Sequence, residues 1–296
     1  MKNSAKPSIT KPRVLVVGRD GQLGHDLMRA LSPAFVALGV DHAGLDITDR
    51  KATEKKVEEV KPDIVLNAAA YNKVEEAGRD PSRAYLVNAL GPYHLAVAAR
   101  AIGVPVLHVS TDYVFPGTKK SGYKEGDETH PLNVYGASKE AGERLVRIGN
   151  PDHWIVRTSA LFGIHAGGGK GYNFVTKMLS LAKEGGEVRV VADQFTAPTY
   201  TRDLADGIRE LLAKEVPCGT YHLVNEGSAT WHDFAREIFR RSGLRTKLTK
   251  TTTADSGTTI DRPKRSILKN KKLKALGIGL PPWEDALGRY LTELHR

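Results

Sequence analysis

The sequence predicts an α/β protein, built from a doubly wound parallel sheet and a smaller C-terminal α+β lobe. Two observations favour this fold class. From Arg13 to about residue 160, short aliphatic runs alternate with amphipathic segments, as expected where strands and helices follow one another. A glycine-rich turn lies between the first strand and the first helix, which is typical of Rossmann-type sheets. Beyond Gly243 the alternation weakens, so a separate lobe is expected there.

The composition is that of an ordinary globular protein and excludes several kinds of site. The single cysteine, Cys218, cannot form an internal disulfide, and no Cys or His pair has the spacing of a zinc site. No apolar run has transmembrane length, and the basic tail at residues 1–12 lacks the apolar stretch of a signal peptide. We therefore expect a cytoplasmic protein without a membrane partner.

The net charge of +10 is spread along the chain, without a nucleic-acid-binding motif among its aromatic residues. The densest part runs from Arg262 to Lys274. Such a run is either a solvated helix face or a dock for an anionic substrate. A phosphorylated small molecule is favoured over nucleic acid.

The first strand and the first helix enclose a candidate phosphate-binding loop. Residues 13–17 are aliphatic and predict a buried strand, and residues 22–31 carry leucines at helical spacing. Gly18, Gly21 and Gly24 lie between them, where glycines let the backbone approach a pyrophosphate at a helix N-terminus. In this context dinucleotide binding is favoured over a purely structural turn.

Two residues bear on the choice between NADH and NADPH. Asp41 follows the predicted strand 35–40, where an acid accepts hydrogen bonds from the adenosine ribose and disfavours a 2′-phosphate. Arg19, inside the glycine loop, favours that phosphate. The two signals conflict, so both cofactors stay open.

The next segment is expected to flank the adenine. Residues 45–47 predict a brief strand, and residues 48–49 provide a helix N-cap for a polar helix that runs to Lys61. Within this strand, Asp46 and Ile47 are the candidate adenine neighbours.

Two further strands are predicted to end at the ligand-binding edge of the sheet. Residues 64–66 form one strand, and the small residues 67–70 that follow let a flat ligand, or a neighbouring helix, pack against the backbone. Residues 104–109 form the other strand and deliver Ser110–Phe115 to the same edge. Between them Pro81 opens a long helix. Its expected packing residues are Tyr85, Leu86, Leu95 and Val97.

Tyr135 and Lys139 are four residues apart, so on a helix they lie on one face. A nearby ammonium favours the phenolate, so Lys139 is expected to lower the pKa of Tyr135 towards neutrality. A hydroxyl at the end of the preceding strand can hydrogen-bond a substrate carbonyl oxygen. With a hydride carrier at the glycine loop, these groups suit carbonyl/alcohol redox chemistry.

The C-terminal half is expected to be a smaller lobe interleaved with the end of the first domain. Its predicted elements are strands at 154–157, 188–192 and 221–224, and helices at 173–181, from Thr201 through Leu212, and from a cap formed by Thr230 and Asp233 to about Gly243.

These segments together resemble the extended short-chain dehydrogenase/reductases, and within them the dTDP-4-dehydrorhamnose reductases. The resemblance runs from about Arg13 to the C-terminus. The segments that carry it are Val17–Gly24, Leu45–Asp49, Pro62–Tyr71, Ser110–Phe115, Tyr135–Lys139, Arg157–Ser159, Asp193-Gln194 with Ala197–Thr199, and Arg262-Pro263 with Ser266 and Leu268.

The resemblance implies a reaction and a set of roles. NAD(P)H would reduce the C4 keto group of dTDP-4-dehydro-6-deoxy-L-mannose to dTDP-L-rhamnose. Tyr135 would protonate the forming alkoxide, Thr111 would hold its oxygen, and Lys139 would lower the tyrosine pKa and bind the nicotinamide ribose. The implied cofactor contacts are Gly18, Arg19, Gly21, Gln22, Leu23, Gly24, Asp41, Asp46, Ile47, Ala68, Ala69, Ala70, Tyr135 and Lys139. The implied substrate contacts are Val74, Glu75, Thr111, Asp112, Asn173, Gln194 and Arg262.

The resemblance also predicts the domain organisation. Residues 13–160 with about 200–225 would form the dinucleotide-binding domain, and 161–199 with 226–296 the nucleotide-sugar lobe. A homodimer and a Mg²⁺ requirement at a subunit interface stay open, although no convincing ligand constellation for the metal is visible.

The family pattern separates some alternatives and leaves others. Related nucleotide-sugar dehydratases carry an acid–base pair where this chain has Asp112 and Tyr113, so elimination is disfavoured. Asn72, Pro116 and Ala160 depart from the usual residues and put the identity of the sugar in doubt. A reductase or epimerase of another nucleotide sugar therefore stays open. So does a regulatory NADP-binding protein similar to the beta subunit of methionine adenosyltransferase.

Overall fold

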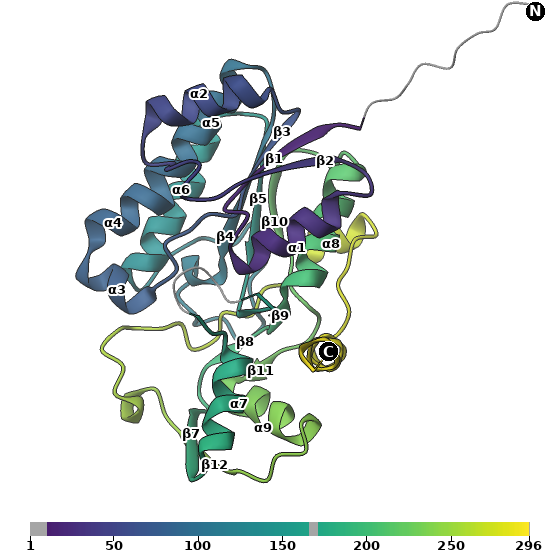
Figure 1. Ribbon diagram of the computed structural model, residues 1–296. Helices are drawn as coiled ribbons and strands as arrows, with labels where there is room; N and C mark the ends of the chain where they lie inside the picture. The colour runs from purple at the N-terminus through teal and green to yellow at the C-terminus, as the bar shows by residue number, and fades with distance from the viewer. Residues whose placement is uncertain (1–10, 166–170, 296) are drawn as a thin grey trace, which may run out of the picture.

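The computed structural model describes residues 11–165 and 171–295, so the predicted basic tail lies almost wholly outside the described residues. Six parallel strands form the main sheet, in the order β10-β5-β4-β3-β1-β2 (Figure 1). Their bounds are Arg13–Val17 (β1), Val36–Val40 (β2), Ile64–Asn67 (β3), Val106–Thr111 (β4), His153–Thr158 (β5) and Gly219–His222 (β10). The strand order reverses between β1 and β3, the switch point at which such sheets bind ligands.

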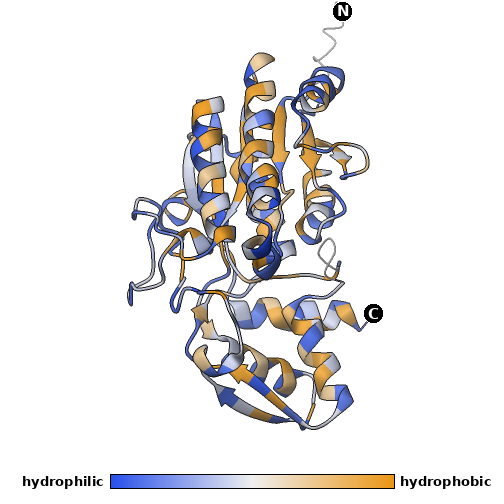
Figure 2. Ribbon diagram, turned by 90° about the vertical axis from the view of Figure 1, so that its left-hand side faces the viewer, coloured by the Kyte–Doolittle hydropathy of each residue, from blue (hydrophilic) through white to orange (hydrophobic). Residues whose placement is uncertain are grey.

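Helices cover both faces of this sheet, which confirms the predicted doubly wound class (Figure 1). On one face lie α1 (Gln22–Leu31) and α8 (Thr201–Ala213), and on the other α2 (Arg50–Val60), α5 (Gly91–Ala101) and α6 (Val134–Gly149). Side chains of β1 alternate between the two cores. Val14 and Val16 pack with α1 and α8, whereas Leu15 and Val17 pack with the helices opposite. The strands appear as apolar segments between amphipathic helices in Figure 2.

The long helix that Pro81 opens contains a change of winding. It is built from α4 (Pro81–Tyr85), a π-helical turn η1 (Leu86–Leu90) and α5, and α3 (Val74–Arg79) precedes it. Tyr85 and Leu86 were expected to pack, but they are 40% and 38% exposed, so that prediction is wrong. The buried positions are Ala84, Asn88 and Ala89 instead. The π-turn changes the residues that face inward, and one helical period does not describe this segment.

The π-turn packs against α6. Asn88, within it, accepts from Tyr71 N at 2.8 Å and donates to Ser138 Oγ at 3.0 Å. A Cβ at Gly142 of α6 would lie 2.1 Å from the Asn88 carbonyl oxygen, so only glycine allows this approach. Helix α6 therefore lies close against the segment that follows β3.

The strand predicted at residues 45–47 is absent from the structure. Instead the chain turns, because Leu45 N donates to Asp41 O at 2.9 Å and Asp46 Oδ1 accepts from Thr48 N at 2.9 Å. The predicted helix cap after it is confirmed, since Asp49 accepts from Ala52 N.

The smaller lobe packs around its own apolar core, with Val175, Phe234, Ile238 and Tyr290 among its members. Its helices are α7 (Phe174–Glu184), α9 (Trp231–Arg241) and α11 (Trp283–Leu294). Three two-stranded sheets complete it: β7 (Glu187–Val191) with β12 (Lys247–Thr251), β8 (Phe195–Thr196) with β11 (Ala229–Thr230), and β6 (Leu161–Phe162) with β9 (Thr199–Tyr200). The remaining short elements are η2 (Asp112–Val114), η3 (Ala254–Ser256) and α10 (Lys271–Ala275).

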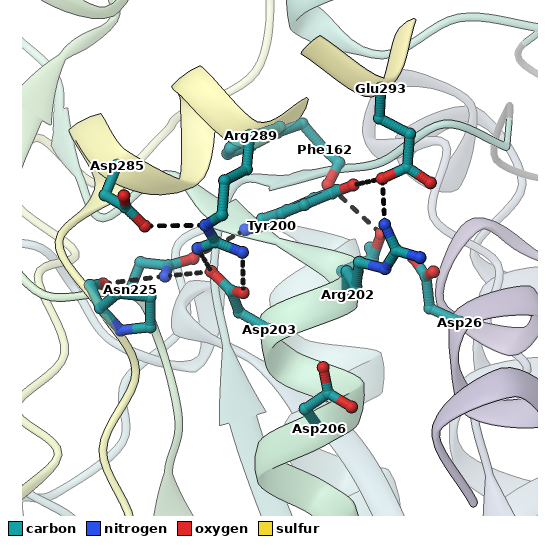
Figure 3. Close-up of polar contacts among 12 residues, drawn as sticks. Asp26, Phe162, Tyr200, Arg202, Asp203, Asp206, Asn225, Asp285, Arg289 and Glu293 are labelled. Carbon is teal, nitrogen blue, oxygen red and sulfur yellow. Dashed lines mark hydrogen bonds and ion pairs between the residues drawn. The ribbon is translucent and has the colours of Figure 1, made fainter. Parts of the chain in front are cut away.

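A network of charged side chains joins α11 to the main domain (Figure 3). Arg289 of α11 donates to both carboxylate oxygens of Asp203 in α8, each at 2.7 Å. Asp203 also accepts from Asn225, which follows β10, at 2.7 Å. Nearby, Glu293 accepts from Tyr200 Oη at 2.6 Å and pairs with Arg202. The C-terminal helix is thereby fixed to α8 and, through α8, to the main sheet.

Within residues 11–165 and 171–295, no helix combines the length and the apolar character that crossing a bilayer requires.

Candidate active site

The predicted catalytic residues meet at the carboxyl end of β4. Thr111 is the last residue of β4, and Tyr135 and Lys139 lie in the first two turns of α6. Asn133 caps this helix by accepting from Gly136 N at 2.9 Å. A Cβ at Gly136 would lie 2.3 Å from the Tyr113 carbonyl oxygen, so the start of α6 contacts the backbone that follows Thr111.

Thr111 contacts both neighbouring functional groups. Its hydroxyl donates to Asp112 Oδ1 at 3.1 Å and accepts from Tyr113 N at 3.2 Å. It also shares a side-chain hydrogen bond with Tyr135. In the β4–β5 register Thr111 lies beside Thr158, whose buried hydroxyl has no hydrogen-bond partner within the described part of the chain. The sheet edge thus presents the Thr111 hydroxyl to the phenol, and Thr158 lies on the neighbouring strand.

The structure corrects the expected electrostatics of Tyr135. Burial raises the pKa of Tyr135 above its ordinary value, and the hydrogen bond with Thr111 opposes this only in part. The Lys139 amino group does not reverse the shift, because it is directed elsewhere. It donates to Val109 O at 2.7 Å and lies 3.3 Å from His108 Nε2. Tyr135 is therefore held in its protonated form, the form that a proton donor requires.

Lys139 is buried at the sheet side of α6. Burial lowers its pKa to about 8, and the carboxylate of Glu143 one turn further along the helix opposes that shift. Glu143 in turn accepts from Ser110 at 2.6 Å and from Arg157 at 2.8 and 2.7 Å. Its pKa is lowered, since these hydrogen bonds and charges outweigh burial. This buried network fixes α6 against β4 and β5.

Asp112 is an unusual carboxyl group. It is buried, and this raises its pKa to about 7, against hydrogen bonds from Ser266 and Thr111. Ser266 belongs to the extended segment that returns from the smaller lobe. Near neutrality a large fraction of Asp112 is therefore a neutral acid beside Thr111.

The glycine loop has the shape that a pyrophosphate needs. Gly18 has φ +86°, and a Cβ there would lie 2.8 Å from Ala69 N. A Cβ at Gly24 would lie 2.1 Å from Gly18 O. The N-cap of α1 is Gly21, which makes no side-chain cap hydrogen bond, and uncapped N–H groups at a helix N-terminus can bind an anion. Gln22 and Leu23 form the first turn of α1.

The residues expected at the adenosine end lie at the ends of β2 and β3. The Arg19 side chain crosses Gly39 of β2, and its charge together with a hydrogen bond from Gly44 N helps to keep the pKa of Asp41 low. Arg19 is half exposed and pairs with Asp20 at 3.1 Å. Both groups that the sequence offered for the ribose are thus present together. The other expected residues here are Asp46, Ile47, Ala68, Ala69 and Ala70, which lie in turns after these strands.

Arg262 crosses the site from the smaller lobe. It pairs with Glu75 in the first turn of α3 and hydrogen-bonds Tyr113. Its Nε is buried and has no partner among the residues that the structure describes. Val74 begins the same helix α3.

The two remaining candidate substrate contacts lie deeper. Asn173 caps α7 by accepting from Thr176 N, and it donates to Gly163 O and Tyr290 Oη. Gln194 donates to Thr253 Oγ1 at 3.0 Å. Their roles as substrate contacts stay predictions.

The structure divides the cationic segment 262–274 rather than forming one helix face. Ser266 reaches Asp112, whereas Arg265, Lys269 and Lys271 line a separate cavity of about 760 Å³. Arg265 lies over the Phe195 ring, 3.8 Å from its centroid. Arg262, in contrast, lies at the Tyr113–Glu75 side of the site.

Sequence reasoning missed His108. The signal was present, because His108 and Ser110 are polar residues at alternate positions of an otherwise aliphatic strand. These two positions face Lys139 and Glu143 of α6, which are four apart on one helix face. The sequence had singled out Ala160 for another reason, and the structure adds that its φ of +43° places this non-glycine residue in the left-handed region.

No group of three or more His, Cys, Asp or Glu side chains suited to a metal ion occurs in residues 11–165 and 171–295. The structure therefore gives the Mg²⁺ expectation no support.

Comparison with known proteins gives a consistent relationship. The family model described as the RmlD substrate binding domain matches residues 12–296. The dTDP-4-dehydrorhamnose reductase of Salmonella typhimurium is 40% identical, over 95% of this chain and 97% of its own. The spore coat polysaccharide biosynthesis protein SpsK of Bacillus subtilis is 39% identical over the same shares. The crystal structure of dTDP-4-dehydrorhamnose reductase from Bacillus anthracis in complex with NADP has a TM-score of 0.91 and 39% identity, over 96% of this chain and all of that one.

Proposed function

The chain belongs to the RmlD family of extended short-chain dehydrogenase/reductases, and from that membership we propose that it reduces the C4 keto group of dTDP-4-dehydro-6-deoxy-L-mannose to dTDP-L-rhamnose. The observation that carries this proposal is the meeting of Thr111 and Tyr135 at the end of β4, beside the glycine loop of β1.

Each group has a defined task in this reaction. NAD(P)H, when bound, supplies the hydride. Tyr135, kept protonated by burial, donates its proton to the sugar oxygen as that oxygen gains negative charge. Thr111 holds the same oxygen by a hydrogen bond, so developing charge meets a preorganised donor. Lys139 binds the nicotinamide ribose.

Glycines and helix polarity support the cofactor proposal. The cradle at Gly18 and Gly24, which a side chain would fill, fits a pyrophosphate against the N-terminus of α1. We propose NADPH as the preferred form, because Arg19 lies across the end of β2, where a 2′-phosphate would lie. The NADP in the Bacillus anthracis relative agrees with this choice.

The diphosphate would displace a carboxylate. Arg262 is the cation nearest to Tyr113, and its guanidinium can bind two phosphate oxygens. Glu75 occupies that guanidinium in the structure. Substrate binding would therefore exchange one anionic partner for another without leaving Arg262 unpaired.

A related sugar is the second candidate. The family resemblance puts Ala160 against the sugar, where many members carry a tryptophan, so the smaller side chain supports a sugar with a bulkier substituent. Similarity to SpsK is equally consistent with a different nucleotide-linked keto sugar.

The decisive assay follows NADPH oxidation with purified protein and dTDP-4-dehydro-6-deoxy-L-mannose, with other dTDP- and UDP-linked 4-keto sugars in parallel. Turnover of the first compound at the highest kcat/KM supports the proposal. Higher kcat/KM with another sugar moves the assignment to that substrate. If the protein binds NADPH but does not oxidise it with any of these sugars, the result would contradict a reductase and support a regulatory protein.

A further inference from the structure

His108 lies between Asn67 of β3 and Lys139 of α6. It is fully buried in β4, with Nε2 3.3 Å from Lys139 Nζ and Nδ1 3.1 Å from Asn67 Nδ2. Asn67, the last residue of β3, is also buried. Three side chains thus form a continuous polar chain beneath the site.

The orientation of Asn67 fixes the tautomer of His108. Asn67 Oδ1 accepts from Ala69 N at 3.0 Å, so its amide nitrogen must face the imidazole. An amide nitrogen is a donor only, and His108 Nδ1 must accept. The imidazole is neutral, because burial and the positive charges of Lys139 and Arg147 lower its pKa well below the ordinary value. Its single proton is therefore on Nε2, which faces Lys139.

The N–H at His108 Nε2 discriminates between the neutral amine and the ammonium form of Lys139. The neutral amine has a lone pair that accepts from His108 Nε2–H, while its own N–H donates to Val109 O at 2.7 Å. The ammonium form has no lone pair, so it cannot accept from His108 Nε2–H, and two hydrogen-bond donors then face each other. Glu143, on α6, acts the other way and favours the ammonium.

We propose that His108 is a positioning residue: held by Asn67 as the Nε2–H tautomer, it stabilises the uncharged amine of Lys139 over the ammonium form in the free protein. This inference rests on the proposed function only for the identity of the ligand that Lys139 meets. Since Ala69 N lies against Gly18 of the glycine loop, the same chain of hydrogen bonds links the backbone beside that loop to Lys139.

The ligand-free protein tests the tautomer directly. Nitrogen NMR of ring-labelled histidine, with His108 assigned by its loss in His108→Gln, reports which ring nitrogen carries the proton. We expect protonation at Nε2 throughout pH 6–9. A proton on Nδ1, or an imidazolium in this range, would overturn the proposal whatever the enzyme reduces.

The effect of His108 on the titration of Lys139 is measured by following the side-chain carbon resonance of Lys139 against pH. This resonance is assigned by its loss in Lys139→Met. In His108→Gln the amide oxygen can accept from the ammonium, so the midpoint of Lys139 should rise by about one pH unit. His222→Gln is the matched control, because His222 is also buried and neutral but lies in β10. Equal midpoints in the two variants and the wild type would sink the proposal.

Asn67→Asp provides an independent arm if His108→Gln fails to fold. Its carboxylate can accept from both Ala69 N and His108 Nδ1–H, which reverses the tautomer and presents a lone pair to Lys139. A midpoint that rises together with an Nδ1-protonated His108 supports the proposal. A raised midpoint with the proton still on Nε2 would reflect the added charge alone and would contradict it.

In the proposed reaction the same shift should be visible in kcat/KM. If the ammonium form is the active one, wild-type kcat/KM falls above about pH 8, and His108→Gln moves that fall to higher pH. A purely structural role of His108 would lower kcat/KM at all pH values without moving the pH at which kcat/KM falls.

Discussion

Arg262 and Glu75 are 187 residues apart in the sequence, yet their side chains pair across the site. Arg262 comes from the segment that returns from the smaller lobe, and Glu75 from the first turn of α3. The pair gives the guanidinium a partner in the free protein, in the place that we assign to the substrate diphosphate.

Replacing Arg262 should therefore act on substrate binding rather than on folding. Arg262→Lys keeps the charge but loses bidentate geometry, and kcat/KM for the dTDP-sugar should fall by about 10- to 100-fold. Arg265→Lys, whose guanidinium lies over Phe195 instead, is the control and should stay within about threefold. Equal losses in steady-state assays of both variants would remove Arg262 from the diphosphate site.

Tyr135→Phe removes the proposed proton donor and leaves the ring in place. We expect kcat to fall by at least about 100-fold, with NADPH affinity nearly unchanged. Tyr113→Phe is matched to it, since the Tyr113 ring contacts Tyr135 edge-on at 5.8 Å between centroids. Its turnover should stay far above that of Tyr135→Phe. Single-turnover rates for both variants test this, and a fully active Tyr135→Phe would refute the assignment.

Asp112 should make stability depend on pH. Its pKa is about 7 in the folded protein, against an ordinary value of 3.8, so the folded state binds more protons between these values. Its stabilising contribution is present below pH 3.8 and is lost as the pH rises through 7. Asp112→Asn should thus raise the free energy of unfolding at pH 8, by up to about 4 kcal/mol, and by less at pH 5. Urea unfolding at both pH values measures this, and a gain that is independent of pH would contradict it.

The buried carboxylate of Glu143 in α6 is expected to be essential for stability. Glu143→Gln leaves Arg157 buried without a counter-charge and should cost about 3–5 kcal/mol of unfolding free energy. Glu140→Gln breaks the more exposed pair with Arg144 on the same helix and should cost below about 1 kcal/mol. Denaturant midpoints compare the two, and similar losses would show that burial of the Arg157 pair does not matter.

Gly24→Ala should distort the glycine loop. The added Cβ would lie 2.1 Å from Gly18 O, which the backbone can relieve only by moving the loop. We expect NADPH affinity to drop by at least about tenfold, a cost of about 1–3 kcal/mol. Gly126→Ala is the control, because no atom lies within 4 Å of its Cβ position. Calorimetric titration with NADPH that gives one Kd for both variants would rule out this role.

Local sequence patterns predicted the main sheet well, because each strand is an aliphatic run that ends at a turn. Val14–Val17 and Val106–Val109 needed no knowledge of their neighbours. The patterns failed where the backbone departs from a standard period. The π-turn at Leu86–Leu90 changed which residues of the Pro81 helix are buried, and residues 45–47 formed hydrogen-bonded turns in place of a strand.

The site was predictable only as far as its residues are close in sequence. Tyr135 and Lys139 share a helix, so their spacing places both at α6. The Lys139 amino group lies against His108, which belongs to a different element. The high pKa of Tyr135 is caused by burial, which the spacing of residues along one helix does not predict. The pairing of Arg262 with Glu75 likewise depends on the path of the chain between the lobes, which no spacing rule encodes.

The place of β10 in the main sheet has a consequence for synthesis on the ribosome. Strand β5 ends at Thr158, and its outer edge has no hydrogen-bonding partner until residues 219–222 have been made. Helix α1 also waits for α8, whose Leu204 and Ile208 complete its apolar core. A nascent chain that ends near residue 200 therefore presents an open strand edge and an uncovered helix face. Such a fragment should associate with other chains, or recruit a chaperone, rather than fold as an independent nucleotide-binding domain.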